Sequence, residues 1–419
     1  MKEDRQQLQW VTREASRCLF CYEAPCKEAC PSRVDVPQFI RMLRWGDIKG
    51  AKRVIKRDNC LGGICAYVCP SEELCEKHCT FRKLGDPIPI ARLQKFACDN
   101  AEYSGYEVLT DKVNKKIAIV GAGPAGLSCA HELRLLGYQL EMFEQEKFLG
   151  GTVTREIPNF KVPNEVIDRD FRELCTEEIM IHHGVSVSRE FIENVLSAQF
   201  DAVFLGMGLA QARRAQVAGE NLRGQYDAET FLKMVKEGQI GKLLGVCVTV
   251  GGGNTAMDCA RTALRLGAIR SIVSYRRSRR EMPADEAEFI KAMKEGVEFL
   301  WQTEPSTLNG SGELQAITLA RTEPSGECGQ DRRSFSAVSG TDFIYPANAV
   351  IWSLGKDRNS MLNDVAVACQ GTVDKETLRI GSSKFFAGGD CISSRQTVVE
   401  AVAQGKRAAR SMHAYLSAR

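Results

Sequence analysis

Cysteines are concentrated near the start of the chain: nine of the 17 lie between positions 18 and 79 of 419. They form two groups, Cys18-x2-Cys21-x4-Cys26-x3-Cys30-Pro31 and Cys65-x3-Cys69-Pro70-x4-Cys75-x3-Cys79, with Cys60 outside both. In iron–sulfur proteins a short Cys-x2-Cys loop holds one part of a cluster. A cysteine followed by proline commonly ligates a different cluster from its sequence neighbours. The two Cys-Pro steps therefore favour two interleaved iron–sulfur clusters.

Structural zinc is the main alternative for these thiols, and unrelated cysteines are a third. Zinc sites usually contain two clean Cys-x2-Cys pairs, so spacings of three and four residues fit them poorly. Disulfides are disfavoured because the opening residues lack the apolar core of an export signal, and reducing compartments keep thiols free. The spacing favours iron–sulfur ligation over zinc.

A first glycine-rich loop follows the apolar segment Ile117-Ala118-Ile119-Val120 and precedes a helical pattern. Glycines at such a turn let backbone amides and the helix N-terminus approach a pyrophosphate. About twenty residues further on, an acid at the end of the next strand accepts hydrogen bonds from a ribose 2′-hydroxyl. The predicted dinucleotide site comprises Gly121, Gly123, Pro124, Ala125, Gly126 and Glu144.

A second glycine-rich loop follows the apolar segment Val246-Cys247-Val248-Thr249-Val250, and its predicted site residues are Gly251, Gly253, Asn254, Thr255 and Ala256. The end of the next strand carries Arg276 and Arg277 and no carboxylate. Because arginines hold a 2′-phosphate that an acid would repel, this loop favours NADP over NAD. A merely solvated basic turn is the alternative.

The elements that must position these residues are those of an α/β protein. From Lys115 onward, short apolar runs alternate with glycine-rich turns and helical patterns, which is typical of parallel sheets. We expect a small helical double-[4Fe–4S] domain at residues 1–112, followed by two Rossmann-like dinucleotide-binding domains. The first would be discontinuous, at 113–244 and 348–419, and the second would occupy 245–347.

Composition excludes several other classes. The chain is 44% hydrophobic and 26% charged, with a formal net charge of +3. Its electrostatic field is therefore too weak to attract nucleic acid or anionic lipid strongly. No aromatic residues interleave with the arginine run, which also argues against nucleic-acid binding. No apolar run approaches the roughly 18 residues of a membrane span. We therefore expect a cytoplasmic protein with neither a nucleic-acid nor a membrane partner.

Three segments, 18–30, 59–70 and 87–96, resemble the amino-terminal region of dihydropyrimidine dehydrogenase, in a family that includes the glutamate synthase small subunit. The resemblance implies two interlocked [4Fe–4S] clusters. It assigns one to Cys18, Cys21, Cys26 and Cys79, and the other to Cys30, Cys69, Cys75 and Gln94. Cys60 and Cys65 are left without a role, although spacing alone makes Cys65 as good a ligand as its neighbours.

The dinucleotide loops resemble the same family through Gly150-Gly151, the segment 157–163 and Phe386-Ala387-Gly388-Gly389-Asp390. The resemblance implies that the first loop binds FAD and the second NADPH. Gly389 and Asp390 would contact the ribityl-phosphate portion, and Thr397-Val398-Val399 would lie against the isoalloxazine. A helix N-terminus there favours the negative charge of reduced flavin.

Together these parts imply an FAD-dependent NAD(P)H oxidoreductase. It would take the two electrons of a hydride together and release them one at a time. Hydride transfer needs no acid–base group, so we assign no catalytic residue. The resemblance implies an electron-input subunit that serves a separate catalytic subunit, foremost the FMN barrel of a two-subunit dihydropyrimidine dehydrogenase. The alternatives are a glutamate synthase small subunit with its large subunit, a ferredoxin-NADP transhydrogenase subunit, and a zinc-stapled nucleotide sensor.

Overall fold

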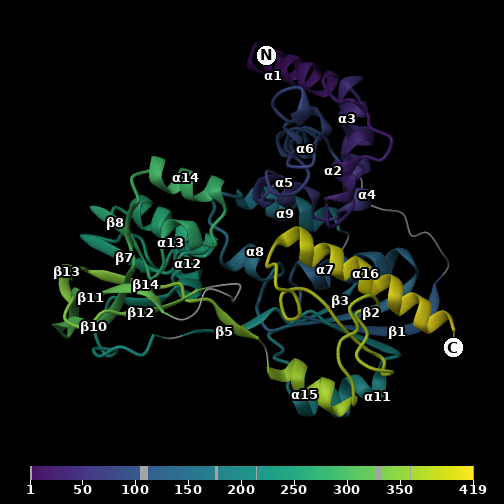
Figure 1. The fold of residues 1–419 in the computed structure, drawn as a ribbon. Helices are drawn as coiled ribbons and strands as arrows, with labels where there is room; N and C mark the ends of the chain where they lie inside the picture. Colours follow the sequence, from purple (N-terminus) through teal and green to yellow (C-terminus); the bar gives the residue numbers. More distant parts are fainter. Residues whose placement is uncertain are drawn as a thin grey trace. The chain divides into compact units, whose positions relative to one another are not determined.

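The computed structural model describes residues 2–103, 112–174, 178–213, 215–325, 333–358 and 360–418 (Figure 1). The chain forms two compact units, Met1–Thr154 with Asn159–Leu209 and Arg358–Arg419, and Arg155–Pro158 with Ala210–Asp357. Within the described ranges, no helix combines the length and the apolar character needed to cross a membrane.

The first unit opens with a helical domain. Its helices are α1 (Lys2–Ser16), α2 (Pro25–Glu28), α3 (Val36–Arg44), α4 (Ile48–Asp58), α5 (Gly62–Val68), the 3-10 turn η1 (Thr80–Lys83) and α6 (Ile90–Asp99). Asp35 and Asp47 cap α3 and α4 by accepting hydrogen bonds from Gln38 N and Gly50 N, which satisfies amides that a helix start leaves free. A core that includes Phe39, Ile40, Ile55 and Leu93 joins these short helices.

The rest of the first unit is a parallel α/β domain with strand order β16-β4-β1-β2-β3. Its strands are β1 (Val113–Val120), β2 (Tyr138–Glu144), β3 (Met180–His183), β4 (Ala202–Leu205) and β16 (Phe385–Ala387). Its helices are α7 (Pro124–Leu135), α9 (Asn164–Glu173), α10 (Arg189–Phe191), η3 (Ile192–Leu196), α11 (Ser197–Gln199), α15 (Ser360–Ala368) and α16 (Val398–Ser417). The long helix α16 packs along α7 (Figure 1).

The second unit repeats this plan, with strand order β6-β14-β7-β8-β9, again all parallel. These strands are β6 (Gln225–Asp227), β7 (Val246–Val250), β8 (Arg270–Tyr275), β9 (Glu298–Trp301) and β14 (Ala349–Trp352). The helices are α12 (Ala228–Lys236), α13 (Asn254–Arg265), η4 (Arg279–Glu281) and α14 (Glu286–Lys294). A separate antiparallel sheet contains β10 (Thr303–Ser311), β11 (Glu313–Ser325), β12 (Ser334–Ala337) and β13 (Phe343–Pro346).

Three short elements lie where the chain passes from one unit to the other: α8 (Thr152–Arg155), β5 (Leu209–Ala212) and β15 (Lys356–Arg358), of which β5 pairs with β15. The predicted fold class is confirmed: the protein is α/β, and a helical domain precedes two parallel sheets of the dinucleotide-binding type. The unit boundaries differ from the expected domain limits, since residues 210–244 and 348–357 belong to the second unit. The physical reason is that β14 pairs with β7 and β6.

Candidate iron–sulfur, flavin and nicotinamide sites

The structure brings together the first expected ligand set, Cys18, Cys21, Cys26 and Cys79, hereafter the outer set. All four thiols are half-buried. The pKa of the Cys26 thiol is raised to about 12, first by burial and then by the neighbouring thiols of Cys18 and Cys79. Burial also raises the pKa of Cys18, with Cys79 and Cys21 adding to the effect. Thiolates this close repel one another unless a cationic centre lies between them, so the donor set fits an iron–sulfur cluster.

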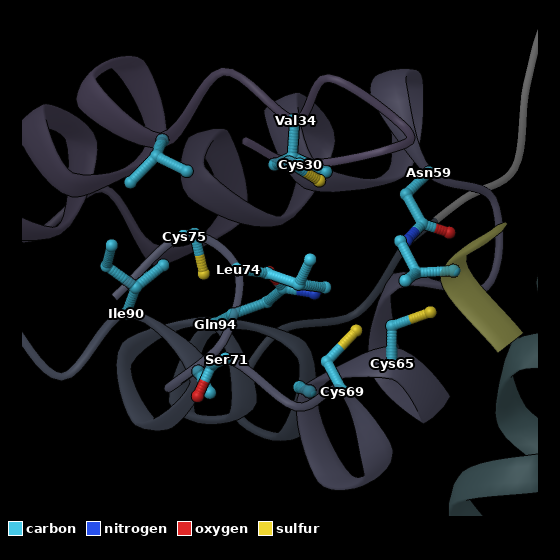
Figure 2. A pocket seen from close by; sticks show the side chains of 14 residues that line it. Cys30, Val34, Asn59, Cys65, Cys69, Ser71, Leu74, Cys75, Ile90 and Gln94 are labelled. Carbon is cyan, nitrogen blue, oxygen red and sulfur yellow. The ribbon is translucent and has the colours of Figure 1, made fainter. Parts of the chain in front are cut away.

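The second expected set lines one cavity, hereafter the inner cavity (Figure 2). Its lining comes from α5, α6, the start of α3 and the loops around them, with one residue from α16: Cys30, Val34, Val36, Asn59, Cys65, Ala66, Cys69, Ser71, Leu74, Cys75, Ile90, Ala91, Gln94 and Val399. Cys69 ends α5 with extended backbone, as expected of a residue before proline. The cavity therefore contains all four expected ligands and Cys65.

Gln94 and Cys65 differ in how they face this cavity. Gln94 is 8% exposed, and its Nε2 donates to Gly62 O at 2.7 Å. This bond fixes the amide plane and leaves the oxygen available as a ligand. In Figure 2, Gln94 lies among the sulfurs of Cys30, Cys69 and Cys75, whereas the Cys65 sulfur points away from it. Cys65 is nevertheless close to this set, since a hydrogen bond with its thiol is the first cause of the raised pKa of Cys69. The choice of Gln94 over Cys65 therefore stays a prediction.

Two further observations bear on the metal chemistry. Cys60 is 5% exposed and does not line the inner cavity, and burial raises the pKa of its thiol to about 12. In the part of the chain that the structure describes, no three His, Cys, Asp or Glu side chains converge closely enough to hold a single metal ion. The ligands of a [4Fe–4S] cube surround a larger centre than one ion.

A buried ion-pair network links α4 and α5 to α9. Lys56 and Asp170 are both 0% exposed, and Lys56 Nζ lies 2.9 Å from Asp170 Oδ1 and 2.9 Å from Glu173 Oε2. Asp170 Oδ2 accepts from Ile64 N at 2.8 Å, and Lys52 Nζ pairs with Glu173 Oε1 at 2.5 Å. Burial alone would lower the pKa of Lys56, but the facing carboxylates outweigh it and raise that pKa above its ordinary value. The network fixes the start of the helix that leads to Cys69.

The first glycine-rich loop joins β1 to α7 as expected. Gly121 has φ +92°, and a Cβ there would lie 2.5 Å from Gly206 O, so only glycine fits. Gly123 caps α7 and Pro124 is its first residue. Glu144 ends β2, where its two oxygens accept from Ala122 N at 2.7 Å and from Glu146 N at 2.9 Å. The carboxylate is thus held against the loop, with lone pairs left for a ribose hydroxyl.

The other expected flavin contacts border the same loop. Gly150 N donates to Ala122 O at 2.8 Å, and a Cβ on Gly151 would lie 3.1 Å from Gly123 Cα. Close approach of this kind keeps the 150–151 turn beside the pyrophosphate loop. Ala125 and Gly126, at the start of α7, are buried.

Helix α16 holds the last of these contacts. Its N-cap, Thr397, accepts from Glu400 N at 3.3 Å. Gln404, 7% exposed, accepts from Gly389 N at 2.7 Å and so fixes the turn that carries Asp390. Gly389 has φ +85°, and a Cβ there would lie 2.9 Å from Ala125 Cβ. The Gly389–Asp390 turn therefore lies over the beginning of α7.

In the second unit, the second loop runs from β7 into α13 with Gly253 as N-cap. Gly251 follows β7, Ala256 is buried and Thr255 is exposed. The Asn254 side chain exchanges two hydrogen bonds with Asp285, at 2.8 and 2.9 Å. Because the N-cap is glycine, no capping side chain covers the first turn of α13, which suits the approach of a pyrophosphate.

The arginines after β8 fall into two kinds. Arg279 pairs with Glu286 and lies 3.9 Å above the Phe289 ring, so its guanidinium already has partners within the chain. Arg276 is exposed, and Arg277 is half-buried, with a buried Nε that has no hydrogen-bond partner among the described residues. An unsatisfied buried guanidinium nitrogen fits an anionic ligand such as a 2′-phosphate.

Two parallel sheets, each with a glycine-rich loop after its central strand, together with a cysteine-rich helical domain, define a dinucleotide-binding oxidoreductase with iron–sulfur centres. The chain belongs to the pyridine nucleotide-disulphide oxidoreductase family, whose model matches residues 115–405. The model for dihydropyrimidine dehydrogenase domain II, 4Fe-4S cluster, matches residues 2–106. The protein is thus an FAD-dependent NAD(P)H oxidoreductase that contains iron–sulfur centres.

Relatives align over nearly the whole chain. The glutamate synthase [NADPH] small chain of Escherichia coli is 33% identical and is covered to 89%, with 94% of this chain aligned. The NAD-dependent dihydropyrimidine dehydrogenase subunit PreT of Salmonella typhimurium is 30% identical and is covered to 94%, with 96% of this chain aligned. The chain is therefore homologous to electron-transfer subunits, as the sequence resemblance implied.

Some relatives are longer, and the chain covers 60% of the NADP(+)-dependent formate dehydrogenase subunit beta of Moorella thermoacetica, which is 32% identical over 94% of this chain. It spans 65% and 67% of two further relatives. Among solved structures, Mycobacterium tuberculosis FprA in complex with NADPH aligns at a TM-score of 0.59 and 19% identity, over 73% of this chain and 85% of FprA. That likeness shows the fold alone.

Three residues of these sites have positions that the sequence did not predict. Asp170 and Gln404 act through hydrogen bonds to backbone amides of distant segments, Ile64 and Gly389. Val399 lines the inner cavity from a helix more than 300 positions beyond the last cysteine of that cavity. No spacing pattern links such residues to the motifs they support, so only the folded chain identifies them.

Proposed function

We propose that this chain oxidises NADPH at FAD and passes the electrons singly, through two [4Fe–4S] clusters, to a separate catalytic subunit of the dihydropyrimidine dehydrogenase type. One observation carries the proposal: the first turn of α16, which we propose to face the flavin, also lines the inner cavity. Val398 is in the helix start proposed to face the flavin, and it packs with Val399 against Cys65, Cys69 and Leu74 of the inner cavity.

When bound, FAD accepts a hydride from the nicotinamide and releases single electrons, and each cluster carries one electron. The residues of the chain supply binding and orientation. In the first unit, Gly121 and Gly123 let amides reach the pyrophosphate, Glu144 faces the ribose, and Gln404 orients the Gly389–Asp390 turn. The N-terminus of α16 is the positive end of the helix dipole, which would stabilise the negative charge of reduced flavin.

The proposed ligands are Cys18, Cys21, Cys26 and Cys79 for the outer cluster and Cys30, Cys69, Cys75 and Gln94 for the inner one. Support comes from the mutual proximity of the outer thiols and from the shared lining of the inner cavity. In place of a thiolate, a neutral amide oxygen reduces the negative charge around the inner cluster, which alters its potential.

NADPH is the proposed reductant because Arg276 and the unsatisfied Nε of Arg277 follow β8, in the place where NAD sites carry an acid. The second candidate function is that of a glutamate synthase small subunit, favoured by the 33% identity to that chain over 94% of this sequence. The match of residues 2–106 to a dihydropyrimidine dehydrogenase domain favours the first candidate.

Anaerobic purification followed by visible spectroscopy tests the proposal. We expect about eight irons per chain, from two four-iron cubes, and we expect NADPH to bleach both the flavin bands and the broad iron–sulfur absorbance. NADH should do so more slowly at equal concentration. Flavin bleaching in a preparation that lacks iron would contradict the cluster assignment, and faster bleaching by NADH would contradict the choice of NADPH.

A further inference from the structure

Apolar side chains next to the outer set are exposed. Leu19 is 49% exposed, Leu84 is 70% exposed and Tyr22 is fully exposed. Leu19 and Tyr22 directly follow the outer-set cysteines 18 and 21, and Leu84 lies five positions after the last of them, 79. Exposed large apolar residues that gather at one place mark interaction surfaces, and aromatic side chains are frequent anchors there.

Contacts hold these segments together over the outer set. Cys21 Sγ lies 3.3 Å from Thr80 Oγ1, which joins the 18–24 loop to η1. Arg17 bridges to the same turn, with its guanidinium 4.6 Å above the Phe81 ring and Nη2 donating to Asp86 O at 2.5 Å.

The backbone of the 18–24 loop explains why its apolar side chains face solvent. Phe20 has φ +50°, a left-handed conformation that is costly for a bulky residue. Its ring packs against the core of the helical domain and lies beneath Arg41, at 5.1 Å. With Phe20 held inward, its neighbours Leu19 and Tyr22 are left outside.

The rim of this surface is basic. Arg82 and Lys83 are exposed on η1, and Arg41 and Arg44 are exposed on α3, where both lie over the Phe20 ring. In the described ranges no carboxylate pairs with any of these four cations. The acids that follow these segments most closely are Glu23, Asp47 and Asp86. Four cations without ion-pair partners in these ranges attract an acidic partner and speed its encounter.

We propose that Leu19, Tyr22 and Leu84, with the rim of Arg41, Arg44, Arg82 and Lys83, form the exit surface, on which a protein that accepts single electrons docks through an acidic face. The inference rests on the proposed function and names the place where electrons leave. Each NADPH gives up a hydride, which carries two electrons. Two acceptor molecules each take one electron, so the oxidation of one NADPH requires two docking events.

The test uses the holoenzyme and oxidised flavodoxin, a small acidic FMN protein whose one-electron-reduced form has its own absorbance band. One NADPH and one solvent proton convert two flavodoxins, each of which gains one electron and one proton. The variant Tyr22→Asp/Leu84→Asp is compared with Val367→Asp, which changes a residue of α15 that is 76% exposed. Ferricyanide serves as the second acceptor because a small anion needs no docked complex.

The expected result is a fall of about tenfold or more in kcat/KM for flavodoxin in the double variant, as for loss of interface anchors. Ferricyanide reduction and iron content should stay at wild-type values, and Val367→Asp should behave as wild type. The wild-type rate with flavodoxin should fall as salt rises. Equal flavodoxin rates in wild type and double variant, or no reduction of flavodoxin by an enzyme that reduces ferricyanide, would overturn the exit surface. Failure with both acceptors would instead contradict the proposed function.

Discussion

Replacement of Asp170 by Asn should destabilise the link between α9 and the helices that surround the inner cavity. Asp170 is 0% exposed and bonds Lys56 Nζ at 2.9 Å and Ile64 N at 2.8 Å. An Asn can keep one of these bonds, but its NH2 group would then face the other donor, either the Lys56 ammonium or the Ile64 amide. Two buried lysines, 52 and 56, would share the single carboxylate of Glu173.

The magnitude follows from this geometry. Removal of one partner from a buried ion pair costs about 3–5 kcal/mol, because the remaining charge stays buried. Lys56 keeps Glu173 and the carbonyl oxygen of Cys60 as acceptors, so we expect the lower end, about 3 kcal/mol. The double variant Lys56→Met/Asp170→Leu removes both charges and should recover much of the loss, since apolar replacement of a whole buried pair is often close to neutral.

Urea denaturation under anaerobic conditions, followed by iron–sulfur absorbance, is the appropriate assay. Bound cofactors and two units preclude one free energy for the whole chain, so midpoints of cluster loss are compared. With slopes of about 1–3 kcal/mol per molar urea, 3 kcal/mol moves the midpoint by about 1 M or more. The control is Glu193→Gln, which breaks an exposed pair with Arg189 that contributes little to stability. If Asp170→Asn shifts the midpoint no more than this control, the buried network does not stabilise the cluster domain.

Three further outcomes follow from the sites. Substitution of Arg276 and Arg277 by Ala should raise KM for NADPH at least tenfold more than KM for NADH, since each good guanidinium–phosphate contact contributes about 1.5–3 kcal/mol; equal effects in steady-state kinetics would contradict a 2′-phosphate site. Gln94→Cys should lower the potential of one cluster and change its EPR signal while the other cluster is unaltered; an unchanged redox titration would exclude Gln94 as a ligand. The pKa of Glu295 is lowered to about 2 by hydrogen bonds, first from Arg261, so its ion pair stabilises the folded state above the ordinary pKa and is lost as pH falls from about 4.5 toward 2. Glu295→Gln should cost about 1–2 kcal/mol at neutral pH after solvent screening, and should flatten acid unfolding between pH 5 and 2; the same acid dependence in both proteins would refute it.

The sequence predicted those parts of the structure that local motifs determine. Glycine positions, the strand before each loop and the acid at the end of β2 all follow from short-range geometry, and β1, β2, β7 and β8 end where the motifs require. The strand at Ala349–Trp352 was also predicted, but its sheet was not. Four apolar residues fit either sheet, and only pairing with β7 decides between them.

The iron–sulfur ligands, too, could be predicted from the sequence only in part. The cysteine spacing indicated clusters, but it gave Cys65 and Gln94 no order of preference, because ligation depends on where a side chain points. The bond from Gln94 to Gly62 O, and the cavity that both residues line, arise from the packing of α6 on α5. A contact between two helices cannot be inferred from the spacing within either one.

The two cysteine sets differ in what surrounds them, and the difference gives the proposed electron path a direction. Cys30, Cys69 and Cys75 are half-buried like the outer thiols, but their cavity is also lined by Val399 of α16. Beside the outer thiols, Tyr22 is fully exposed. A centre adjacent to α16 suits transfer from flavin, whereas a centre beside an exposed surface suits transfer to another protein. We therefore propose that the path runs from α16 through the inner cavity to the outer set. Disruption of the inner cluster alone should stop flavodoxin reduction while NADPH still bleaches the flavin.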